Sequence, residues 1–346
     1  MKGEQKAFDQ LVSDQLVSDQ LVSDQLVSVV IPTYNRAHLI IDALNSVYRQ
    51  SYRPIELVVV DDGSKDDTTT VVRDWFKTHA ENYQFSCRYI QQDNLGGNPA
   101  RNRGIKESTG SFIAFLDSDD SWHPQKLEKQ IAAFDGNSKI GGVYCGLRHV
   151  FYESGIIQSA PPREYPSGQL LHQMLVHDVT APTSTYILRA EVFDKVGCFD
   201  EQLLARQDWD MWIRLAAEFE IGVVPEVLVD FKEHSGTRTA SNPQKEIDAY
   251  RTIMGKYREL RARCPLSIRQ AAKASFYRRM GRVHFHQEIS ATYAFTYYVQ
   301  AILSWPFTFD SYAALVGMML PAKFRQFVHI SWNRLFGATK LSIKSH

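Results

Sequence analysis

Between residues 26 and 134, short apolar runs alternate with segments whose apolar residues recur at helical spacing. Leu26 to Ile31 and Ile55 to Val60 are rich in β-branched residues, which favours strands that are buried on both faces. Between Ile40 and Val47 the apolar residues recur at i, i+3, i+4 and i+7, which predicts an amphipathic helix. This alternation predicts an α/β fold with a mostly parallel sheet flanked by helices.

The same patterns predict further elements. We expect helices at Val71–Phe76, Ala100–Ser108, Leu127–Phe134 and Trp209–Phe219, and strands at Arg88–Ile90, Ser111–Leu116 and Thr183–Leu188. Residues 141–240 are otherwise less regular, and the pattern turns helical beyond Pro243. We therefore divide the chain into residues 1–27, 28–145, 146–242 and 243–346.

Residues 9–28 are four copies of Asp-Gln-Leu-Val-Ser. A period of five fits neither a helix nor a strand, so we expect residues 1–27 to form a poorly ordered leader. The chain shows no signal peptide and no apolar stretch of about 18 residues, so we predict no spanning helix. Four scattered cysteines without a C-x-x-C pair argue against a zinc site or a disulfide framework and fit a reducing compartment.

The charge is unevenly distributed. Residues 256–346 contain 14 Lys or Arg and 3 Asp or Glu, a net charge of about +11. A face with apolar residues at helical spacing precedes the final basic stretch, and it comprises Ala294, Tyr297, Tyr298, Ala301, Ile302 and Trp305. This region could pack on the protein's own core or lie on an anionic membrane surface. No recognised nucleic-acid-binding module is present, so we expect no nucleic-acid partner.

Polar clusters follow three of the predicted strands: Thr33-Tyr34-Asn35, Asp61-Asp62-Gly63-Ser64 and Asp117-Ser118-Asp119-Asp120. The carboxyl ends of parallel strands are where α/β sheets bind ligands. Three carboxylates within four residues repel one another unless a cation or hydrogen-bond donors compensate, and Mg²⁺ and Mn²⁺ prefer oxygen ligands. The alternative is a solvated turn with Asp120 or Ser121 as the N-cap of a helix.

Three further motifs carry candidate residues. Glycines precede a predicted helix in Asn94 to Asn102, where Arg101 or Arg103 could contact phosphate, although neither G-x-G-x-x-G nor a Walker loop is present. Asp208, in Gln207-Asp208-Trp209, could be a general base or simply an N-cap. His234 lies in Phe231 to Gly236, and a lone histidine is more often structural.

Taken in order, these motifs resemble the family 2 glycosyltransferases, which have the nucleotide-sugar-binding GT-A fold. The similarity covers roughly Leu26 to Ala240 and includes Val27 to Arg36, Val60 to Ser64, Gly97 to Gly104, Phe115 to Asp120 and Gln207 to Trp209. It implies an inverting enzyme that transfers a sugar from a nucleotide-sugar donor. One departure is Gln207, where many members carry Glu.

The resemblance also implies a role for individual residues. Pro32, Thr33 and Tyr34 would line the base pocket. Asp62 would contact uracil or an equivalent base, and Asp117 would lie near the ribose. Asp119 would ligate Mn²⁺ or Mg²⁺, His234 would help with the metal or the diphosphate, and Asp208 would remove the acceptor proton. The acceptor would be a glycan or lipid-linked hydroxyl in bacterial surface polysaccharide or glycolipid synthesis, at the cytoplasmic face of a membrane. Two other functions remain open at this point, namely a sugar nucleotidyltransferase and a catalytically silent scaffold that binds nucleotide-sugars.

Overall fold

The computed structural model describes residues 26–79, 84–134, 136–151, 156–158, 165–233, 242–286 and 289–319. All but the last two residues of the predicted leader lie outside these ranges. The chain forms two compact units. The α/β unit comprises Met1–Leu171, Val179–Leu203 and Gln207–Thr237, and the helical unit comprises His172–Asp178, Leu204–Arg206 and Arg238–His346.

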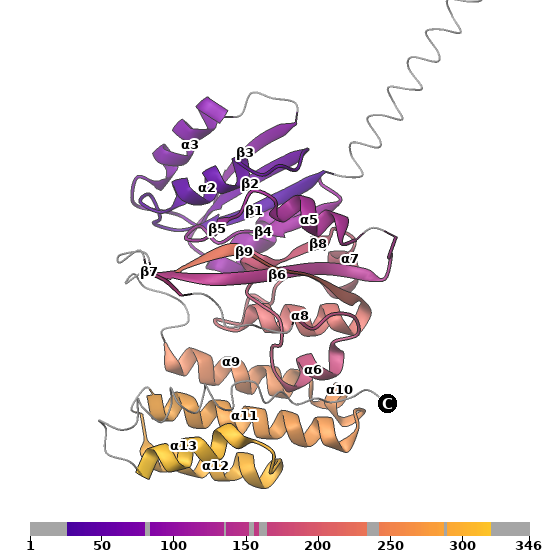
Figure 1. Cartoon of the computed structure of the whole chain (residues 1–346). Helices are drawn as coiled ribbons and strands as arrows, with labels where there is room; N and C mark the ends of the chain where they lie inside the picture. Colours follow the sequence, from indigo (N-terminus) through magenta and orange to yellow (C-terminus); the bar gives the residue numbers. More distant parts are fainter. Residues whose placement is uncertain are drawn as a thin grey trace, which may run out of the picture. The chain divides into compact units, whose positions relative to one another are not determined.

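One nine-stranded sheet organises the α/β unit, in the order β3-β2-β1-β4-β8-β6-β9-β5 with β7 beside β6 (Figure 1). Its strands are β1 (Val27–Thr33), β2 (Ile55–Asp61), β3 (Phe85–Gln91), β4 (Phe112–Phe115), β5 (Ser121–Trp122), β6 (Ile140–Phe151), β7 (Ile156–Gln158), β8 (Ile187–Arg189) and β9 (Glu220–Glu233). The helices that accompany it are α2 (Ile40–Tyr48), α3 (Thr68–His79), α4 (Gly97–Glu107), α5 (Lys126–Ala132), α7 (Val192–Val196) and α8 (Gln207–Glu218).

The first half of the sheet confirms the predicted α/β fold, because β3, β2, β1 and β4 pair in parallel. The second half is mixed: β8 runs antiparallel to both β4 and β6, whereas the long strands β6 and β9 pair in parallel. These two long strands lie in the segment that looked irregular in sequence. Register shifts interrupt their pairing between Ile140 and Leu147, and such bulges break the alternation that reveals a strand.

The prediction of a strand over Thr183–Leu188 is wrong for its first half. Thr183–Thr185 form a 3-10 turn, η1, and β8 begins only at Ile187. The carbonyl of Pro182 accepts the backbone N–H of Thr185 at 3.0 Å, so this backbone bonds within the turn instead of to a neighbouring strand. Ser184 is fully buried at the centre of the turn.

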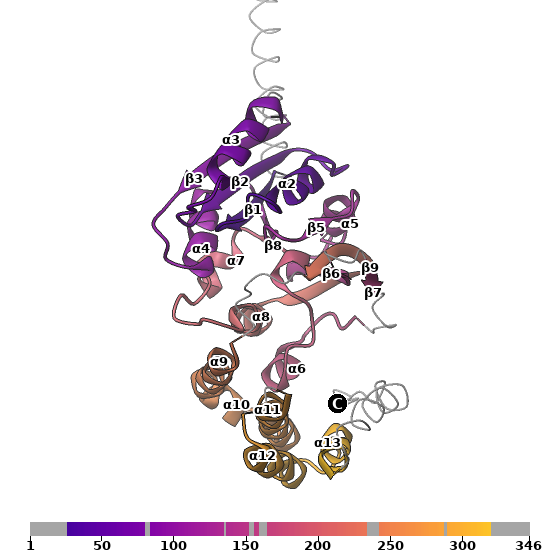
Figure 2. The same cartoon turned by 90° about the vertical axis from the view of Figure 1, so that its left-hand side faces the viewer.

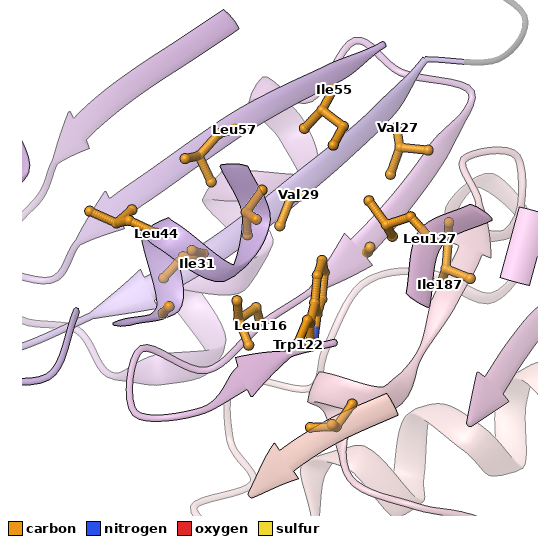
Figure 3. Close-up of a cluster of buried hydrophobic side chains, with 14 of the residues drawn as sticks. Val27, Val29, Ile31, Leu44, Ile55, Leu57, Leu116, Trp122, Leu127 and Ile187 are labelled. Carbon is orange, nitrogen blue, oxygen red and sulfur yellow. The ribbon is translucent and has the colours of Figure 1, made fainter. Parts of the chain in front are cut away.

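Alternate side chains of the parallel strands pack on opposite faces of the sheet. On one face Val29 of β1 and Leu57 of β2 meet Leu44 of α2 in the main core (Figure 3). On the other face Val58 packs with Ala100 of α4, and Figure 2 shows α2 and α4 on opposite sides of these strands. The sheet is therefore covered on both faces, as the apolar runs predict.

Helix α4 approaches β1 unusually closely at Gly104. A Cβ atom built on Gly104 would lie 2.3 Å from Cγ1 of Val30. No side chain larger than hydrogen fits without movement of the helix. The glycine thus fixes the distance between α4 and the sheet.

The helical unit contains α9 (Pro243–Lys256), α10 (Arg258–Ala262), α11 (Leu266–His286), α12 (Ala291–Ser304), α13 (Phe309–Met319) and most of α6 (Leu171–Val176). The predicted aromatic face of α12 is internal: Ala294, Tyr298 and Ala301 are buried. Tyr298 lies against Gly281 of α11, within 3.0 Å of where a Cβ would be. Among the described residues, no helix is both long and apolar enough to cross a bilayer.

Candidate active site

Two loops that follow β1 and β2 are joined by hydrogen bonds between their backbones and side chains. The N–H of Asn35 donates to Oγ of Ser64 at 2.9 Å, and Oδ1 of Asn35 accepts the N–H of Lys65 at 2.8 Å. Asn35 has a φ of +52°, a left-handed conformation that asparagine tolerates better than most residues. These bonds fix the shape of the edge where a ligand of the parallel sheet would bind.

The predicted base-pocket residues lie at this edge. Pro32 and Thr33 end β1 and are buried, and Tyr34 is 39% exposed. Oγ1 of Thr33 is buried without a hydrogen-bond partner, which is uncommon for a buried hydroxyl. The edge therefore offers an exposed aromatic ring beside an unused hydroxyl, and the predicted contact of these residues with a base stays a prediction.

Asp62 holds the next loop in place. Its carboxylate accepts hydrogen bonds from Nε2 of Gln92 at 2.8 Å, from the N–H of Leu95 at 2.9 Å and from the N–H of Gly96 at 2.7 Å. Three donors on one carboxylate order the segment that leads into α4. A contact between Asp62 and a base stays a prediction, and the structure adds this loop-holding role.

Asp117 is paired with the arginine that the sequence suggested for phosphate binding. Nη2 of Arg101 lies 2.5 Å from Oδ1 of Asp117, and the guanidinium stacks near Phe199, 5.9 Å from the ring centroid. Arg101 is only 8% exposed. It therefore orients Asp117 and neutralises its charge, while a direct contact of Arg101 with phosphate stays a prediction.

Asp119 faces a cation that the sequence did not single out. Nη2 of Arg36 lies 3.8 Å from Oδ2 of Asp119, and both side chains are partly exposed, at 22% and 18%. At that distance the positive guanidinium offsets the electrostatic repulsion between the carboxylate of Asp119 and those of Asp117 and Asp120, as a divalent cation would. Arg36 belongs to the opening motif of the sequence, but nothing in sequence spacing placed it near Asp119.

Asp120 has a structural position distinct from that of Asp117 and Asp119. It is 1% exposed, and its carboxylate accepts Oγ–H of Ser184 at 2.6 Å and the N–H of Lys232 at 3.1 Å. Burial, with the nearby charges of Asp119 and Asp117, raises the pKa of Asp120 well above its ordinary value. The solvated-turn alternative is wrong, because Asp120 is buried and strand β5, not a helix, follows it.

Ser184 connects the two ends of the acidic loop. Its Oγ accepts the backbone N–H of Asp117 at 3.1 Å while donating to Asp120. The carbonyl of Ser184 also accepts the indole N–H of Trp122 at 2.8 Å. Sequence analysis missed Ser184 because it lies 64 residues beyond Asp120 in an irregular segment.

Asp208 lies in the first turn of α8 and is half-buried. Oδ1 of Asp208 accepts the N–H of Trp209 at 2.9 Å, and α8 begins one residue earlier, so Asp208 is not the N-cap. One turn further, the Trp212 ring stacks on Tyr186 with 3.6 Å between centroids. Tyr186 follows η1 directly, so the turn that holds the acidic loop also anchors the helix that carries Asp208.

Two asparagines of α4 hold the segment that precedes α8. Nδ2 of Asn98 donates to the carbonyls of Asp200 and Leu203 at 3.0 and 2.9 Å. Asn102 exchanges hydrogen bonds of 2.9 Å with the backbone of Phe199 through both its amide atoms. Both asparagines belong to the predicted middle motif, and the structure shows that their side chains bind protein backbone.

A divalent cation fits the oxygen chemistry of the acidic loop. The described residues contain no group of three His, Cys, Asp or Glu side chains that could enclose a metal ion. Magnesium and manganese commonly use one or two carboxylates and take their remaining ligands from water and substrate phosphates. Asp119, with its partly exposed carboxylate, suits that mode, whereas the buried Asp120 does not. His234, the other predicted metal residue, lies outside the described residues.

Comparison with known proteins identifies the family. Residues 28–197 match the model of glycosyl transferase family 2. An uncharacterized glycosyltransferase of Rickettsia prowazekii is 32% identical over 232 residues, which cover 64% of this chain and 69% of the relative. The amylovoran biosynthesis glycosyltransferase AmsB of Erwinia amylovora is 28% identical over 234 residues, which cover 64% of this chain and 74% of AmsB.

A solved structure shows the same fold. The structure of TarS from S. aureus in complex with UDP-GlcNAc has a TM-score of 0.60 and 20% sequence identity, covering 90% of this chain and 88% of the other. At this identity the likeness concerns the fold alone. The family model spans the acidic loop together with the loops after β1 and β2, and this chain belongs to glycosyl transferase family 2 and is a glycosyltransferase.

Proposed function

We propose that the protein is an inverting, metal-dependent glycosyltransferase that moves a sugar from a UDP-sugar to a hydroxyl of a glycan or lipid-linked acceptor. One observation carries this proposal. Ser184 and Tyr186, two residues apart, hold the acidic loop and the helix of Asp208 respectively. A donor-side carboxylate and a candidate general base are thus fixed to one rigid turn, as a single displacement requires.

The reaction follows from these groups. The acceptor hydroxyl attacks the anomeric carbon while the bond from that carbon to the diphosphate oxygen breaks, so the anomeric centre inverts. Asp208 accepts the hydroxyl proton, a general-base contribution worth about 10²–10⁴-fold. Asp119, with Asp117 nearby, would hold a Mn²⁺ or Mg²⁺ ion that stabilises the charge developing on the departing nucleoside diphosphate.

The proposed donor site is the sheet edge formed by the loops that follow β1 and β2. Tyr34 can stack on a base with its exposed ring, and Thr33 has an unused hydroxyl. UDP is favoured because TarS, which has the same fold, binds UDP-GlcNAc. Arg36 lies 3.8 Å from Asp119 and can turn to the diphosphate when a cation takes its place.

The acceptor and the location are inferred from relatives and from charge. AmsB is named for amylovoran biosynthesis, which supports a role in bacterial surface polysaccharide or glycolipid synthesis. We place this synthesis at the cytoplasmic face of a membrane, because the net charge of about +11 in residues 256–346 suits an anionic leaflet. Membership of a glycosyltransferase family sets aside the nucleotidyltransferase and scaffold alternatives.

Isothermal titration calorimetry tests the donor site. We expect UDP to bind the wild type more tightly with Mn²⁺ than without it, and Asp119→Ala to remove that gain. Asp74→Ala is the matched control, because it removes an exposed carboxylate that pairs with Lys77 three residues away on α3. GDP binding in place of UDP would show that the donor carries guanine instead of uracil. The absence of any nucleotide binding would refute the proposal.

A further inference from the structure

Helix α13 carries an apolar stripe on its exposed side. Phe309, Tyr312, Val316 and Met319 are 46%, 41%, 52% and 77% exposed. Their spacing of three, four and three residues places them on one face of the helix. We call these four residues the α13 stripe.

The opposite side of α13 faces the protein, since Ser311 is fully buried. The aromatic face of α12 is likewise engaged, because Tyr298 packs against α11. The buried residues of α12 (Ala294, Tyr298 and Ala301) are therefore not available to a membrane surface. The α13 stripe is a separate surface whose side chains remain exposed after the described helices have packed.

The net charge of the described helical segments favours an anionic partner. Residues 242–286 and 289–319 contain 11 Lys or Arg and 4 Asp or Glu, a difference of 11 − 4 = +7. The acidic residue of α13 itself, Asp310, is paired with Arg278 of α11, with 2.5 Å between Nη1 and Oδ2. The sequence that follows, residues 320–346, contains five Lys or Arg and no Asp or Glu.

The described part of α13 comprises 11 residues, a length of about 16 Å at 1.5 Å per residue, against a hydrocarbon core of about 30 Å. A helix with aromatic and aliphatic residues on one side, in a unit of net positive charge, is suited to lie in the plane of the interface. Tyrosine suits that region because it is apolar on one side and wet on the other, and phenylalanine suits its apolar side.

We propose that the α13 stripe inserts into the headgroup region of an anionic lipid leaflet and docks the glycosyltransferase on the membrane. Only the purpose of this docking, which is to bring the site to a lipid-linked acceptor, rests on the proposed function. The basic residues attract the leaflet over a Debye length of about 10 Å, and the stripe supplies apolar burial. Both contributions are needed for stable attachment.

Co-sedimentation of the full chain with vesicles tests the proposal. We expect the wild type to sediment with phosphatidylcholine vesicles that contain about 30% phosphatidylglycerol, and weakly with pure phosphatidylcholine. The triple variant Tyr312→Ser, Val316→Ser, Met319→Ser should lower the partition coefficient at least about tenfold. The matched control is Ile156→Ser with Ile157→Ser, two exposed apolar residues of β7 in the other unit, and it should bind as the wild type does.

Hydrogen exchange on the unaltered protein gives a second measurement. We expect amides of residues 309–319 to exchange more slowly when anionic vesicles are added. Equal sedimentation of the triple variant and the wild type, or unchanged exchange in α13, would overturn the proposal. A concentration-dependent dimer that the triple variant abolishes would also overturn it, because a second copy would then cover the stripe. UDP binding, measured on the same samples, reports on the donor site independently.

Discussion

The hydroxyl of Ser184 donates a 2.6 Å hydrogen bond to the carboxylate of Asp120 and accepts the backbone N–H of Asp117. One side chain from the 183–185 turn therefore sets the geometry of both ends of the acidic loop. Two protein donors, Oγ–H of Ser184 and the N–H of Lys232, contact the most buried carboxylate of the loop.

Replacing Ser184 by alanine should damage both stability and donor binding. The variant leaves the buried carboxylate of Asp120 with one fewer donor, and we expect the free energy of unfolding to fall by about 1–3 kcal/mol. Urea unfolding measures this loss, and calorimetry with UDP and Mn²⁺ should show weaker binding. Ser138→Ala, on an exposed loop, should change neither. The combined variant Asp120→Asn, Ser184→Ala should cost less than the sum of the single changes, because the two groups share one interaction.

Arg36 should compete with a metal ion for Asp119. Without nucleotide, we expect Arg36→Ala to bind Mn²⁺ about two- to fivefold more tightly than the wild type, the range of a partly exposed ion pair. In the presence of Mn²⁺ the same variant should bind UDP less tightly than the wild type, because the positive charge of the Arg36 guanidinium beside the diphosphate is lost. Arg49→Ala, at the exposed end of α2, serves as the control. Equal Mn²⁺ affinity in Arg36→Ala and the wild type would contradict the competition.

Asp208→Asn should lower turnover by at least about a hundredfold while leaving UDP affinity unchanged. The substitution keeps the size of the side chain but removes its ability to accept the acceptor proton. Release of UDP with a suitable acceptor measures turnover. Glu218→Gln, at the exposed far end of the same helix, controls for loss of a negative charge on α8. A variant that retained more than a tenth of normal turnover would exclude Asp208 as the base.

Lys126 should make stability depend on pH in an unusual direction. The side chain is fully buried, with Nζ 3.9 Å from the ring centroid of Trp122 and bonded to Gln130 at 2.7 Å. Burial lowers the pKa of Lys126 from 10.5 to about 8. Between these values the unfolded chain binds more protons than the folded one, so the free energy of unfolding should rise with pH from about 8 to 10.5.

A pKa difference between 10.5 and about 8 corresponds to a rise in the free energy of unfolding on the order of 3 kcal/mol. Comparison of wild type and Lys126→Met by urea unfolding at several pH values isolates it, with Cys145→Ala in both proteins, because the Cys145 thiol interacts electrostatically with Lys126. Lys126→Met should lack the rise and be the more stable protein at pH 7. Parallel curves for the two proteins would show that Lys126 titrates normally.

Gly104→Ala should be destabilising by about 1–3 kcal/mol, because its Cβ would meet Val30 at 2.3 Å. Thermal unfolding measures the loss, and Val30→Ala in the same chain should restore part of it by opening space. Gly255→Ala is the matched control, since Gly255 lies in helix α9 with no atom within 4 Å of its Cβ position. That change should be neutral or stabilising by about 1 kcal/mol.

The elements that could be predicted from sequence are those whose signal is local. Strands β1 and β2 are continuous apolar runs, and α2 has a clear helical period, so each was recognisable on its own. Strands β6 and β9 were not, because register shifts between Ile140 and Leu147 break the alternation of their side chains. Secondary structure is thus best predicted where one periodic pattern of apolar and polar residues persists over the whole helix or strand.

The site divides in the same way. Asp119 and Asp208 stood out because each belongs to a short motif with a known chemical use. Ser184 and Arg36 did not, because their partners Asp120 and Asp119 lie 64 and 83 residues away. No local sequence pattern predicts such contacts. Asp120 was recognised only as part of an acidic cluster, and its burial follows from tertiary packing that spacing alone does not encode.

The hydrogen bond from the N–H of Lys232 to Asp120 spans 112 residues. Closing so long a loop is entropically costly and slow compared with local pairing. On the ribosome, β1 to β4 can emerge and pair well before Lys232 is synthesised, while the carboxylate of Asp120 still lacks a permanent donor. The acidic loop is therefore among the last parts of the α/β unit to gain its hydrogen-bond donors, and a nascent chain that has paired β1 to β4 still lacks the strand that completes the loop.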